Sequence, residues 1–276
     1  MPVPAEDWLV SDWPAPRHVH ALFTTRAGGV SVAPFDSLNL GDHVRDEAAA
    51  VATNRARLGQ RLGARPVFLQ QVHGTAVATL DQHTPDGTVA DACITTQPGI
   101  ACTVMVADCL PVLFTDAEGT VVAAAHAGWR GLVGSGADVD GQGVLETCWA
   151  AVVAALQTRQ PQRTREDIAA NTLAWLGPCI GPEAFEVGEE VRAAFVAWRA
   201  DAASCFQPLA AQGKYLTNLP QLARLRLRAM GITRLFGNDG TLPWCTVTQA
   251  SRFFSHRRDA VRLGSTGRMA ACIHIG

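Results

Sequence analysis

The stretch GIACTVMVADCLPVLFTD, residues 99–116, and the stretch VVAAAHAG, residues 121–128, decide the fold. They are short apolar runs rich in valine with turn residues between them, and such runs predict strands. We therefore expect three successive strands, over residues 99–109, 110–116 and 121–128. Cys109 and His126 lie close to the ends of these runs, so the same part of the chain also carries groups that can do chemistry.

The rest of the chain mixes strands and helices. Further strands are predicted at residues 17–25, 66–74, 243–249, 252–256 and 269–275, and helices at residues 46–62, 143–157, 189–200 and 218–231. Because these elements follow one another without a regular βαβ rhythm, the pattern favours an α+β fold over a doubly wound parallel sheet. We expect one domain over residues 1–276, in which helices cover two sheets.

The composition excludes several classes of function. The net charge is only −2 with both signs interspersed, so no basic surface that would gather nucleic acid is expected. The apolar runs are too short to span a membrane, and the N-terminal segment MPVPAEDWLVSDWP lacks the apolar stretch of a secretory signal. Eight cysteines at irregular spacings without a CxxC pair indicate reduced thiols. We therefore expect a cytoplasmic protein with no nucleic-acid or membrane partner.

Three potential metal ligands stand at the ends of apolar strands: His73 in QQVHG, Cys109 in ADCLP and His126 in AHAGWRG. A glycine or proline follows each of them within two residues, where a strand opens into a loop and where functional groups concentrate. Two imidazoles and a thiolate leave a fourth position for water, as in catalytic zinc sites, and they also suit copper. The residues alone equally allow Cys109 to be a nucleophile or a small buried thiol.

Six of the other cysteines (Cys93, Cys102, Cys148, Cys205, Cys245 and Cys272) have no such partners in sequence, and most are expected to be core thiols. A Gly-Pro-rich loop around Cys179 would expose that thiol, although a structural role is still favoured there.

Arginines near loops form a second group of candidates. A guanidinium group can grip phosphate or carboxylate with two hydrogen bonds, which points to an anionic substrate group. The arginines concerned are Arg26, Arg130, Arg257, Arg258 and Arg268. Asn39 in SLNLG and Asp91 in VADAC lie in turn-like contexts, where they can orient a substrate or cap a turn.

Several longer motifs together resemble one protein family. In chain order they are TTRAGGVSVAPFDSLNLG, QVHG, ADCLPVLF, AAAHAGWRGL, LGPCIGPEAFEVG and FFSHRRDAVRLGSTGRMA. Together they closely resemble the bacterial YfiH family, whose members are also called laccase-domain or multicopper polyphenol oxidase proteins. The resemblance extends over residues 13–275, and the metal ligands of the family fall on His73, Cys109 and His126.

The resemblance implies a fold, a metal and an activity. The fold is an α/β/β/α sandwich with mixed sheets, similar to that of a toxin family of cysteine hydrolases, and the metal is Zn²⁺, with Cu²⁺ as an alternative. The activity is phosphorolysis of adenosine, inosine and methylthioadenosine, with adenosine deamination as a second activity. The implied partners are a purine nucleoside and phosphate, and the protein is expected to be a monomer or homodimer. Some members are thought to act as amidases on cell-wall precursor peptides.

Two positions depart from the family pattern. The loop GLVGSGADVDGQGVLE, residues 131–146, is longer than the usual connection after Arg130, which would alter substrate access. His256 stands in FFSHRRD where the family often has tyrosine, and we expect it to take over a packing role rather than an acid–base role.

The histidine inventory allows the competing functions to be ranked. A multicopper cluster uses many HxH pairs, but the chain has eight histidines and only His18 and His20 form such a pair. This speaks against a multicopper oxidase. The first hypothesis, which the resemblance implies, is a zinc-dependent purine nucleoside phosphorylase, in which zinc would lower the pKa of a bound water toward about 7. The second is a cysteine hydrolase with Cys109 as nucleophile and His126 or His73 as base. A single-copper polyphenol oxidase and a structural metal site are further alternatives.

Overall fold

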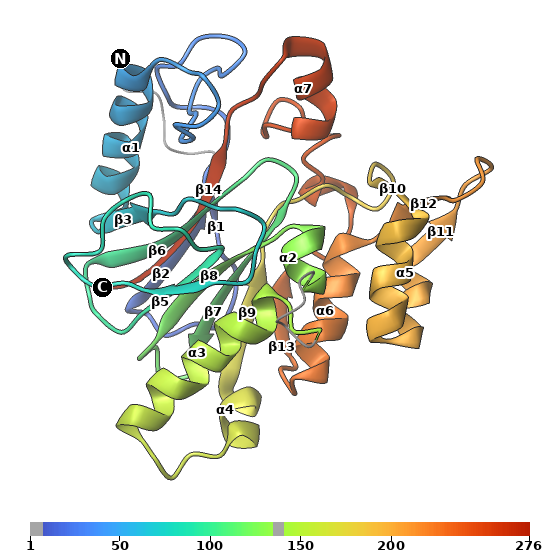
Figure 1. Cartoon of the computed structure of the whole chain (residues 1–276). Coiled ribbons are helices and arrows are strands. Elements are labelled where there is room, and N and C mark those ends of the chain that lie inside the picture. The colour runs from blue at the N-terminus through green and yellow to red at the C-terminus, as the bar shows by residue number, and fades with distance from the viewer. Residues whose placement is uncertain (1–7, 135–140) are drawn as a thin grey trace.

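Two β-sheets pack face to face, and helices cover both outer faces, as Figure 1 shows. The computed structural model describes residues 8–134 and 141–276. The five-stranded sheet contains, in spatial order, β1 (Leu9–Val10), β2 (Val19–Phe23), β14 (Met269–Ile275), β6 (Ile100–Val106) and β3 (Arg65–Phe68). The six-stranded sheet contains β13 (Arg234–Gly237), β9 (Thr172–Leu176), β7 (Leu110–Asp116), β8 (Val122–Ala127), β5 (Ala92–Thr95) and β4 (Val77–Thr79).

Both sheets are mixed. β3 pairs with β6, β4 with β5 and β13 with β9 in parallel, whereas the other strand pairs of these two sheets are antiparallel. The prediction of an α+β sandwich with mixed sheets is therefore confirmed.

The alternation of side chains along each strand creates the layers, because successive side chains of a strand point to opposite faces. In β7, Leu113 belongs to the apolar cluster between the sheets, whereas Val112 and Phe114 belong to the cluster under the helices. In β6, Val104 faces the other sheet and Met105 faces outward. Every residue of these strands is buried, which explains why they are largely apolar.

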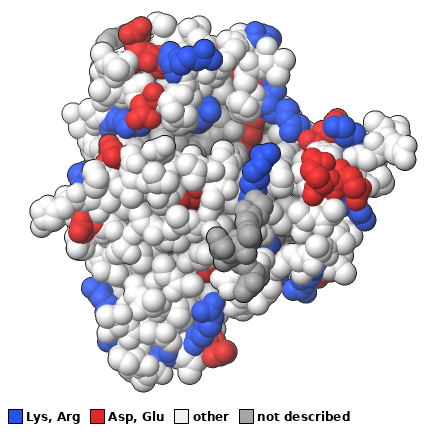
Figure 2. Space-filling model, in the orientation of Figure 1, with Lys and Arg blue, Asp and Glu red and all other residues white. Residues whose placement is uncertain are grey.

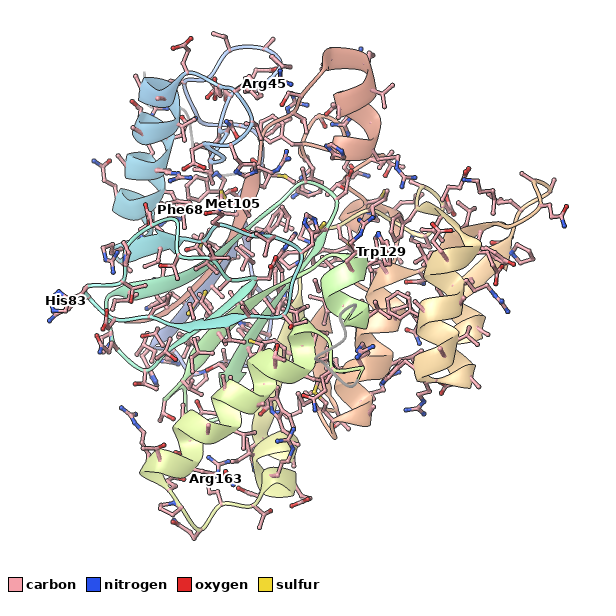
Figure 3. All side chains as sticks on the ribbon, viewed as in Figure 1. Arg45, Phe68, His83, Met105, Trp129 and Arg163 are labelled. Atoms are coloured by element: carbon pink, nitrogen blue, oxygen red, sulfur yellow. The ribbon has the colours of Figure 1, made fainter. Side chains whose placement is uncertain are left out.

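Helix α1 (Ala48–Leu62) covers the outer face of the five-stranded sheet. Leu58 packs there with Phe68 and Met105, which Figure 3 shows close to each other beside α1. The helix ends where the sequence predicts, because Gly63 has a φ of 66° and its N–H bonds the carbonyl of Gly59.

The six-stranded sheet is covered by the remaining long helices. They are α3 (Val144–Arg159), α4 (Arg165–Asn171), α5 (Glu189–Trp198) and α6 (Leu219–Ala229), next to a 3-10 helix (Ala200–Cys205) and a small sheet of β10 (Glu186–Gly188), β12 (Lys214–Thr217) and β11 (Phe206–Pro208). The side chain of Asn218 accepts a hydrogen bond from the N–H of Gln221 and caps α6. Among the described residues, no helix is both long and apolar enough to cross a membrane.

Two predicted strands are wrong. Residues 243–249 form the end of a 3-10 helix (Leu242–Trp244) and turns, because Pro243 cannot donate to a strand ladder. Residues 252–256 lead into α7 (His256–Leu263), which begins there because the Ser255 hydroxyl accepts from the N–H of Arg258. The strand predicted at residues 66–74 ends at Phe68. Of the long loop predicted after Arg130, residues 135–140 lie outside the described residues, and α2 (Trp129–Val133) fills its beginning.

A substitution in the middle of β8 tests how tightly the two sheets pack. Ala124 is fully buried in the cluster between them, and a larger side chain there would force the sheets apart. We expect Ala124→Leu to lower the free energy of unfolding by about 1–3 kcal/mol in urea titrations. The matched change Ala52→Leu on the exposed side of α1 should alter it by less than about 0.5 kcal/mol, and equal effects would contradict the tight packing.

Candidate functional site

The register of β7 and β8 builds the first half of the site. The two strands are antiparallel, and Leu110 pairs with Ala127 while Pro111 pairs with His126. The residue before β7 and the last residues of β8 therefore lie at the same edge of the sheet. This register places Cys109 beside His126.

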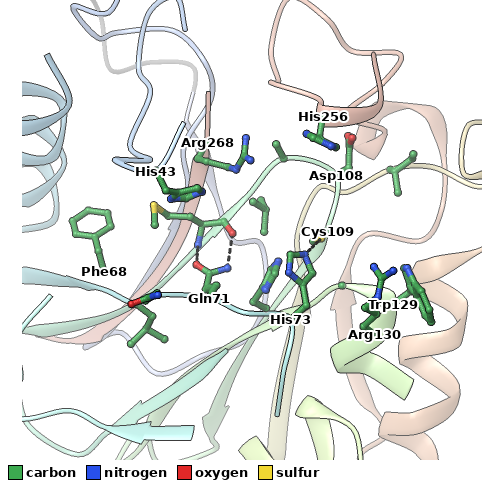
Figure 4. Close-up of a pocket in the computed structure, with 18 of the residues that line it drawn as sticks. His43, Phe68, Gln71, His73, Asp108, Cys109, Trp129, Arg130, His256 and Arg268 are labelled. Carbon is green, nitrogen blue, oxygen red and sulfur yellow. Dashed lines mark hydrogen bonds between the residues drawn. The ribbon is translucent and has the colours of Figure 1, made fainter. Parts of the chain in front are cut away.

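A loop after β3 brings His73 to the same edge. The side-chain amide of Gln71 donates to the Met105 carbonyl at 2.8 Å and accepts from the Met105 N–H at 2.7 Å, as Figure 4 shows. These two bonds fasten the loop to β6. His73 itself has a φ of 61°, an uncommon conformation for a residue with a side chain, which functional sites often contain.

The three predicted ligands meet in the structure. The ligand atoms of His73, Cys109 and His126 all lie within 4.8 Å of one another. The sulfur of Cys109 is 3.7 Å from Nε2 of His73, and the centroids of the two imidazole rings are 4.8 Å apart. His126 is buried, Cys109 half-buried and His73 exposed, so the cluster is open on one side.

Asp91 holds both histidines in place. One carboxylate oxygen accepts from the N–H of His73 at 2.9 Å and from Nδ1 of His126 at 2.8 Å. The other oxygen accepts from the N–H groups of Val72 and Gly74 at 3.1 and 2.7 Å. Burial raises the pKa of Asp91, but the hydrogen bond and charge of His126 and the backbone N–H groups lower it further, to below its usual value. Because Nδ1 of His126 carries the bound proton, Nε2 is left to face a ligand.

Asp108 shapes the turn that carries Cys109. It has a φ of 88°, and its carboxylate accepts from the hydroxyls of Thr246 and Ser255 at 2.6 and 3.0 Å and from the N–H of Arg257 at 2.6 Å. The turn between β6 and β7 is thereby tied to the start of α7. Asp108 therefore fixes the loop that carries Cys109.

The electrostatics of the cluster activate the thiol. Burial raises the pKa of Cys109, but the charge of His126 and the hydrogen bonds with His126 and His73 outweigh it and lower the pKa to about 6. Burial lowers the pKa of His126, but the charge of Cys109 and the hydrogen bond to Asp91 raise it to about 9. At pH values between about 6 and about 9, the Cys109 thiolate therefore faces the His126 imidazolium.

The cluster opens into a cavity of about 870 Å³. Its wall carries aromatic side chains (Phe68, Trp129 and Phe185) and basic ones (Arg55, Arg130, Arg257 and Arg268). Figure 2 shows acidic and basic side chains interspersed over the viewed face. An aromatic and basic cavity suits a ligand with a planar ring and an anionic group.

Arg26 and Arg258 are engaged away from the cavity wall. The guanidinium group of Arg26 bonds the carbonyls of Asp36 and Ala250, both at 3.0 Å, and pairs with the Asp36 carboxylate at 3.2 Å. Arg258 pairs with Asp259 at 2.7 Å and donates to the carbonyls of Thr246, Val247 and Phe253. Arg26 thus links the loop at Asp36 to Ala250, and Arg258 links the start of α7 to the segment before it.

Asn39 and Asp91 are fully buried and lie behind the cavity rather than on its wall. Asn39 donates to the carbonyl of Gly41 and accepts from the backbone N–H groups of Gly41 and Arg268. It therefore supports a wall of the site from the back. Of the arginines that the sequence offered for an anionic group, Arg130, Arg257 and Arg268 line the cavity.

Several wall residues were missed in the sequence because only the fold brings them together. Gln71, Phe68 and His43 come from separate segments, and nothing in their local sequence marks them. His256 is exposed at the start of α7 and lines the cavity, so the packing role expected for it is wrong. The exposure expected for Cys179 is also wrong, because it is fully buried, as are the other cysteines apart from Cys109.

The donor set and the space around it fit a metal ion. A Cβ atom added at Gly128 would lie 2.9 Å from Cδ2 of His73 and 3.0 Å from the sulfur of Cys109. Only a residue without a side chain leaves these two groups free to converge. Two imidazole nitrogens and one thiolate, with a carboxylate orienting one imidazole, match the donors and supporting bonds of catalytic zinc sites.

Comparison with known proteins agrees with this picture. A family described as multi-copper polyphenol oxidoreductase laccase matches residues 20–276. The chain is 49% identical to a purine nucleoside phosphorylase of Pseudomonas aeruginosa and 46% identical to the purine nucleoside phosphorylase YfiH of Escherichia coli, in each case over 97% of this chain and 98% of the relative. A solved structure from Neisseria meningitidis superposes with a TM-score of 0.83 at 42% identity, covering 98% of this chain and 99% of that one. The resemblance inferred from the motifs is confirmed.

The pKa of Cys109 gives a prediction for the metal-free protein. Because the thiolate forms as the pH rises through about 6, alkylation by iodoacetamide should accelerate through that pH and level off above it. An ordinary cysteine would show its midpoint near pH ~8.5. Labelling measured by mass spectrometry in chelated protein tests this, with Cys109→Ala as the control that loses the fast phase. A midpoint at the ordinary value would contradict the thiolate–imidazolium pair.

Gly128 gives a prediction for metal binding. Its φ of −65° suits any residue, so Gly128→Ala adds a methyl group between His73 and Cys109 without backbone strain. We expect the dissociation constant for zinc to rise about 10-fold or more, as happens when the surroundings of metal ligands are disturbed. The same exchange at Gly59 in α1 should leave zinc affinity unchanged. Unchanged affinity in Gly128→Ala would show that the metal lies elsewhere.

Proposed function

The chain belongs to the multi-copper polyphenol oxidoreductase laccase family, which includes YfiH, and we propose that it is a metal-dependent purine nucleoside phosphorylase. The observation that carries this proposal is the cluster of His73, Cys109 and His126 at the base of an aromatic and basic cavity. We assign adenosine, inosine and methylthioadenosine as substrates and adenosine deamination as a second activity. The relatives named purine nucleoside phosphorylase support purine nucleosides as the class of substrate.

His73, Cys109 and His126 would hold the metal. We assign zinc, with copper as the alternative, because the donor set suits both ions. When bound, such an ion supplies Lewis-acid polarisation at the cavity base. A multicopper cluster is disfavoured, since in the described residues, which include all eight histidines, this is the one group of three or more potential ligands.

Phosphorolysis exchanges one bond at the ribose C1′ atom for another. An oxygen of hydrogen phosphate bonds to C1′ as the bond from C1′ to the purine nitrogen breaks. The purine leaves with the bonding electron pair and takes up the proton of the hydrogen phosphate, which gives ribose 1-phosphate. The chain contributes by holding the two reactants together and by placing positive charge beside the phosphate.

Residues of the chain divide these tasks. Trp129 and Phe185 offer aromatic faces for the purine, and Arg130 and Arg257 offer positive charge on the same wall. Asp91 acts through His126, whose Nδ1 proton it holds, and Asn39 acts through the backbone of the wall. Seven of the eight free cysteines are buried, and this supports the cytoplasm as the place of action.

Zinc-loaded protein incubated with inosine and phosphate tests the proposal. We expect hypoxanthine and ribose 1-phosphate in equal amounts, and a loss of rate of about 100-fold or more in Cys109→Ala, because a Lewis acid contributes several kcal/mol. Cys205→Ala removes a buried thiol far along the chain in the 3-10 helix and should keep the activity. Failure of metal-loaded wild-type protein to form ribose 1-phosphate would overturn the proposal.

A second candidate function rests on the same cysteine. Cys109, His126 and Asp91 form the order of nucleophile, base and orienting carboxylate found in cysteine hydrolases, and the pKa of Cys109 is lowered to about 6. This arrangement would suit an amidase acting on cell-wall precursor peptides. Metal-free protein should then hydrolyse a peptide amide through an acyl adduct on Cys109. Stoichiometric zinc whose affinity depends on Cys109 would speak against it.

A further inference from the structure

The four arginines on the cavity wall are not equivalent. Arg55 is neutralised by Asp42 at 3.2 Å and Asp86 at 3.8 Å, and its guanidinium group stacks on the ring of Phe68. Arg268, in contrast, has no carboxylate within 4.0 Å of its nitrogens in residues 8–134 and 141–276. It brings a positive charge to the wall that the described part of the protein does not balance by an ion pair.

The side chain of Arg268 is held in a fixed position. Its Nη1 donates to the carbonyls of Thr266 and Gly267 at 3.0 and 3.2 Å, and its backbone N–H donates to Asn39 at 2.8 Å. A Cβ atom at Gly41 would lie 2.7 Å from Cγ of Arg268, so the glycine is needed for the stem to pass. These contacts occupy one edge of the guanidinium group and leave Nε and Nη2 for a ligand.

The guanidinium group lies next to the ligand cluster. Figure 4 shows Arg268 pointing into the cavity between His43 and His256, above His73 and Cys109. Arg268, Asp108 and Cys109 line the same cavity, and the negative charges of Cys109 and Asp108 oppose the lowering of the Arg268 pKa by burial. Burial and the charge of Arg268 in turn lower the pKa of His43, which favours a neutral imidazole beside it. An anion bound here would be held within reach of the reacting atoms.

Other anion-binding groups nearby are already occupied. The Asp108 carboxylate takes the N–H of Arg257 at the start of α7, so this helix end has its anion. Arg26 and Arg258, which the sequence offered for phosphate, bond carbonyls and carboxylates of the chain. Arg130 and Arg257 also form no ion pair among the described residues, but both are exposed, and Arg257 donates to the carbonyl of Glu186 at 3.1 Å. Arg268 is the half-buried arginine on the wall without an ion pair in the described part of the chain.

We propose that Arg268 binds the phosphate co-substrate and so determines the specificity for phosphate as the attacking group. The identity of the anion rests on the proposed phosphorolysis, whereas the presence of an anion site rests on the geometry alone. A phosphate oxygen pair meets Nε and Nη2 of Arg268 in a two-bond grip, which lysine cannot reproduce.

Steady-state kinetics of the zinc-loaded full chain test the proposal. In Arg268→Met the KM for phosphate should rise about 10- to 100-fold, because hydrogen bonds between a charged group and the phosphate are lost. The KM for inosine and the kcat at saturating phosphate should change less than about threefold, since binding of one reactant alone is lost. Arg268→Lys should restore part of the affinity, and Arg262→Met on the exposed side of α7 should match wild type.

Equilibrium dialysis with inorganic phosphate separates this inference from the proposed function. Arg268→Met should bind phosphate about 10- to 100-fold more weakly than wild type, whether or not inosine is turned over. Gly41→Ala, which keeps the charge but displaces the stem, should also weaken phosphate binding. Unchanged phosphate affinity in a folded Arg268→Met protein would overturn the inference. The inference would also be overturned if Arg268→Met bound adenosine 5′-monophosphate more weakly than wild type but bound inorganic phosphate equally well. Wild-type protein that binds phosphate through Arg268 but forms no ribose 1-phosphate would overturn the proposed function and leave the anion site standing.

Discussion

The carboxylate of Asp91 is the constraint on which the site depends. It accepts four hydrogen bonds, three from consecutive backbone N–H groups of the His73 loop and one from Nδ1 of His126. One buried charge therefore fixes a loop and a strand end relative to each other. Such a charge is stable inside a protein only when donors surround it, and here the donors are the elements that must be positioned. The histidine pair would lose its geometry together with this carboxylate.

His73 and Asp108 have positive φ angles, which are unfavourable for residues with a side chain. Both residues lie in turns that leave the sheets, and both are held by bonds to distant segments. Asp108 and Asp91 have similar roles. Asp91 accepts from backbone N–H groups of the His73 loop, and Asp108, which precedes Cys109, accepts from the N–H of Arg257. The rigid part of the protein is the sandwich, and the site consists of two turns and one strand end that the carboxylates of Asp91 and Asp108 hold in place.

The sequence predicts the layers well because apolar runs and helix ends are local signals. The apolar runs of β6, β7 and β8 and the glycine after α1 specify their elements through residues close in the chain. Motif resemblance then selects His73, Cys109 and His126. The wrong strands near residues 243–256 are apolar too, but Pro243 and the Ser255 cap override that pattern. The cavity wall as a whole could not be predicted, because residues from separate segments, such as Arg268 before β14 and Gln71 after β3, meet only through the pairing of β14, β6 and β3.

The two roles proposed for Cys109, metal ligand and nucleophile, both depend on a thiolate that lies beside a positive charge. Without a metal, the buried thiolate is stabilised by a protonated His126, which the Asp91 carboxylate supports. A metal ion can bind Nε2 of His126 only when that nitrogen is free of its proton, so metal and proton compete for the same lone pair. The bond to Asp91 uses Nδ1 and persists in both states. The cluster is therefore prepared for a cation at Nε2 whether it is a proton or a metal, and the thiolate that would attack as a nucleophile is the one that a metal would neutralise. Binding of the metal must suppress the hydrolase chemistry, which makes the two functions exclusive in any single molecule at a given moment.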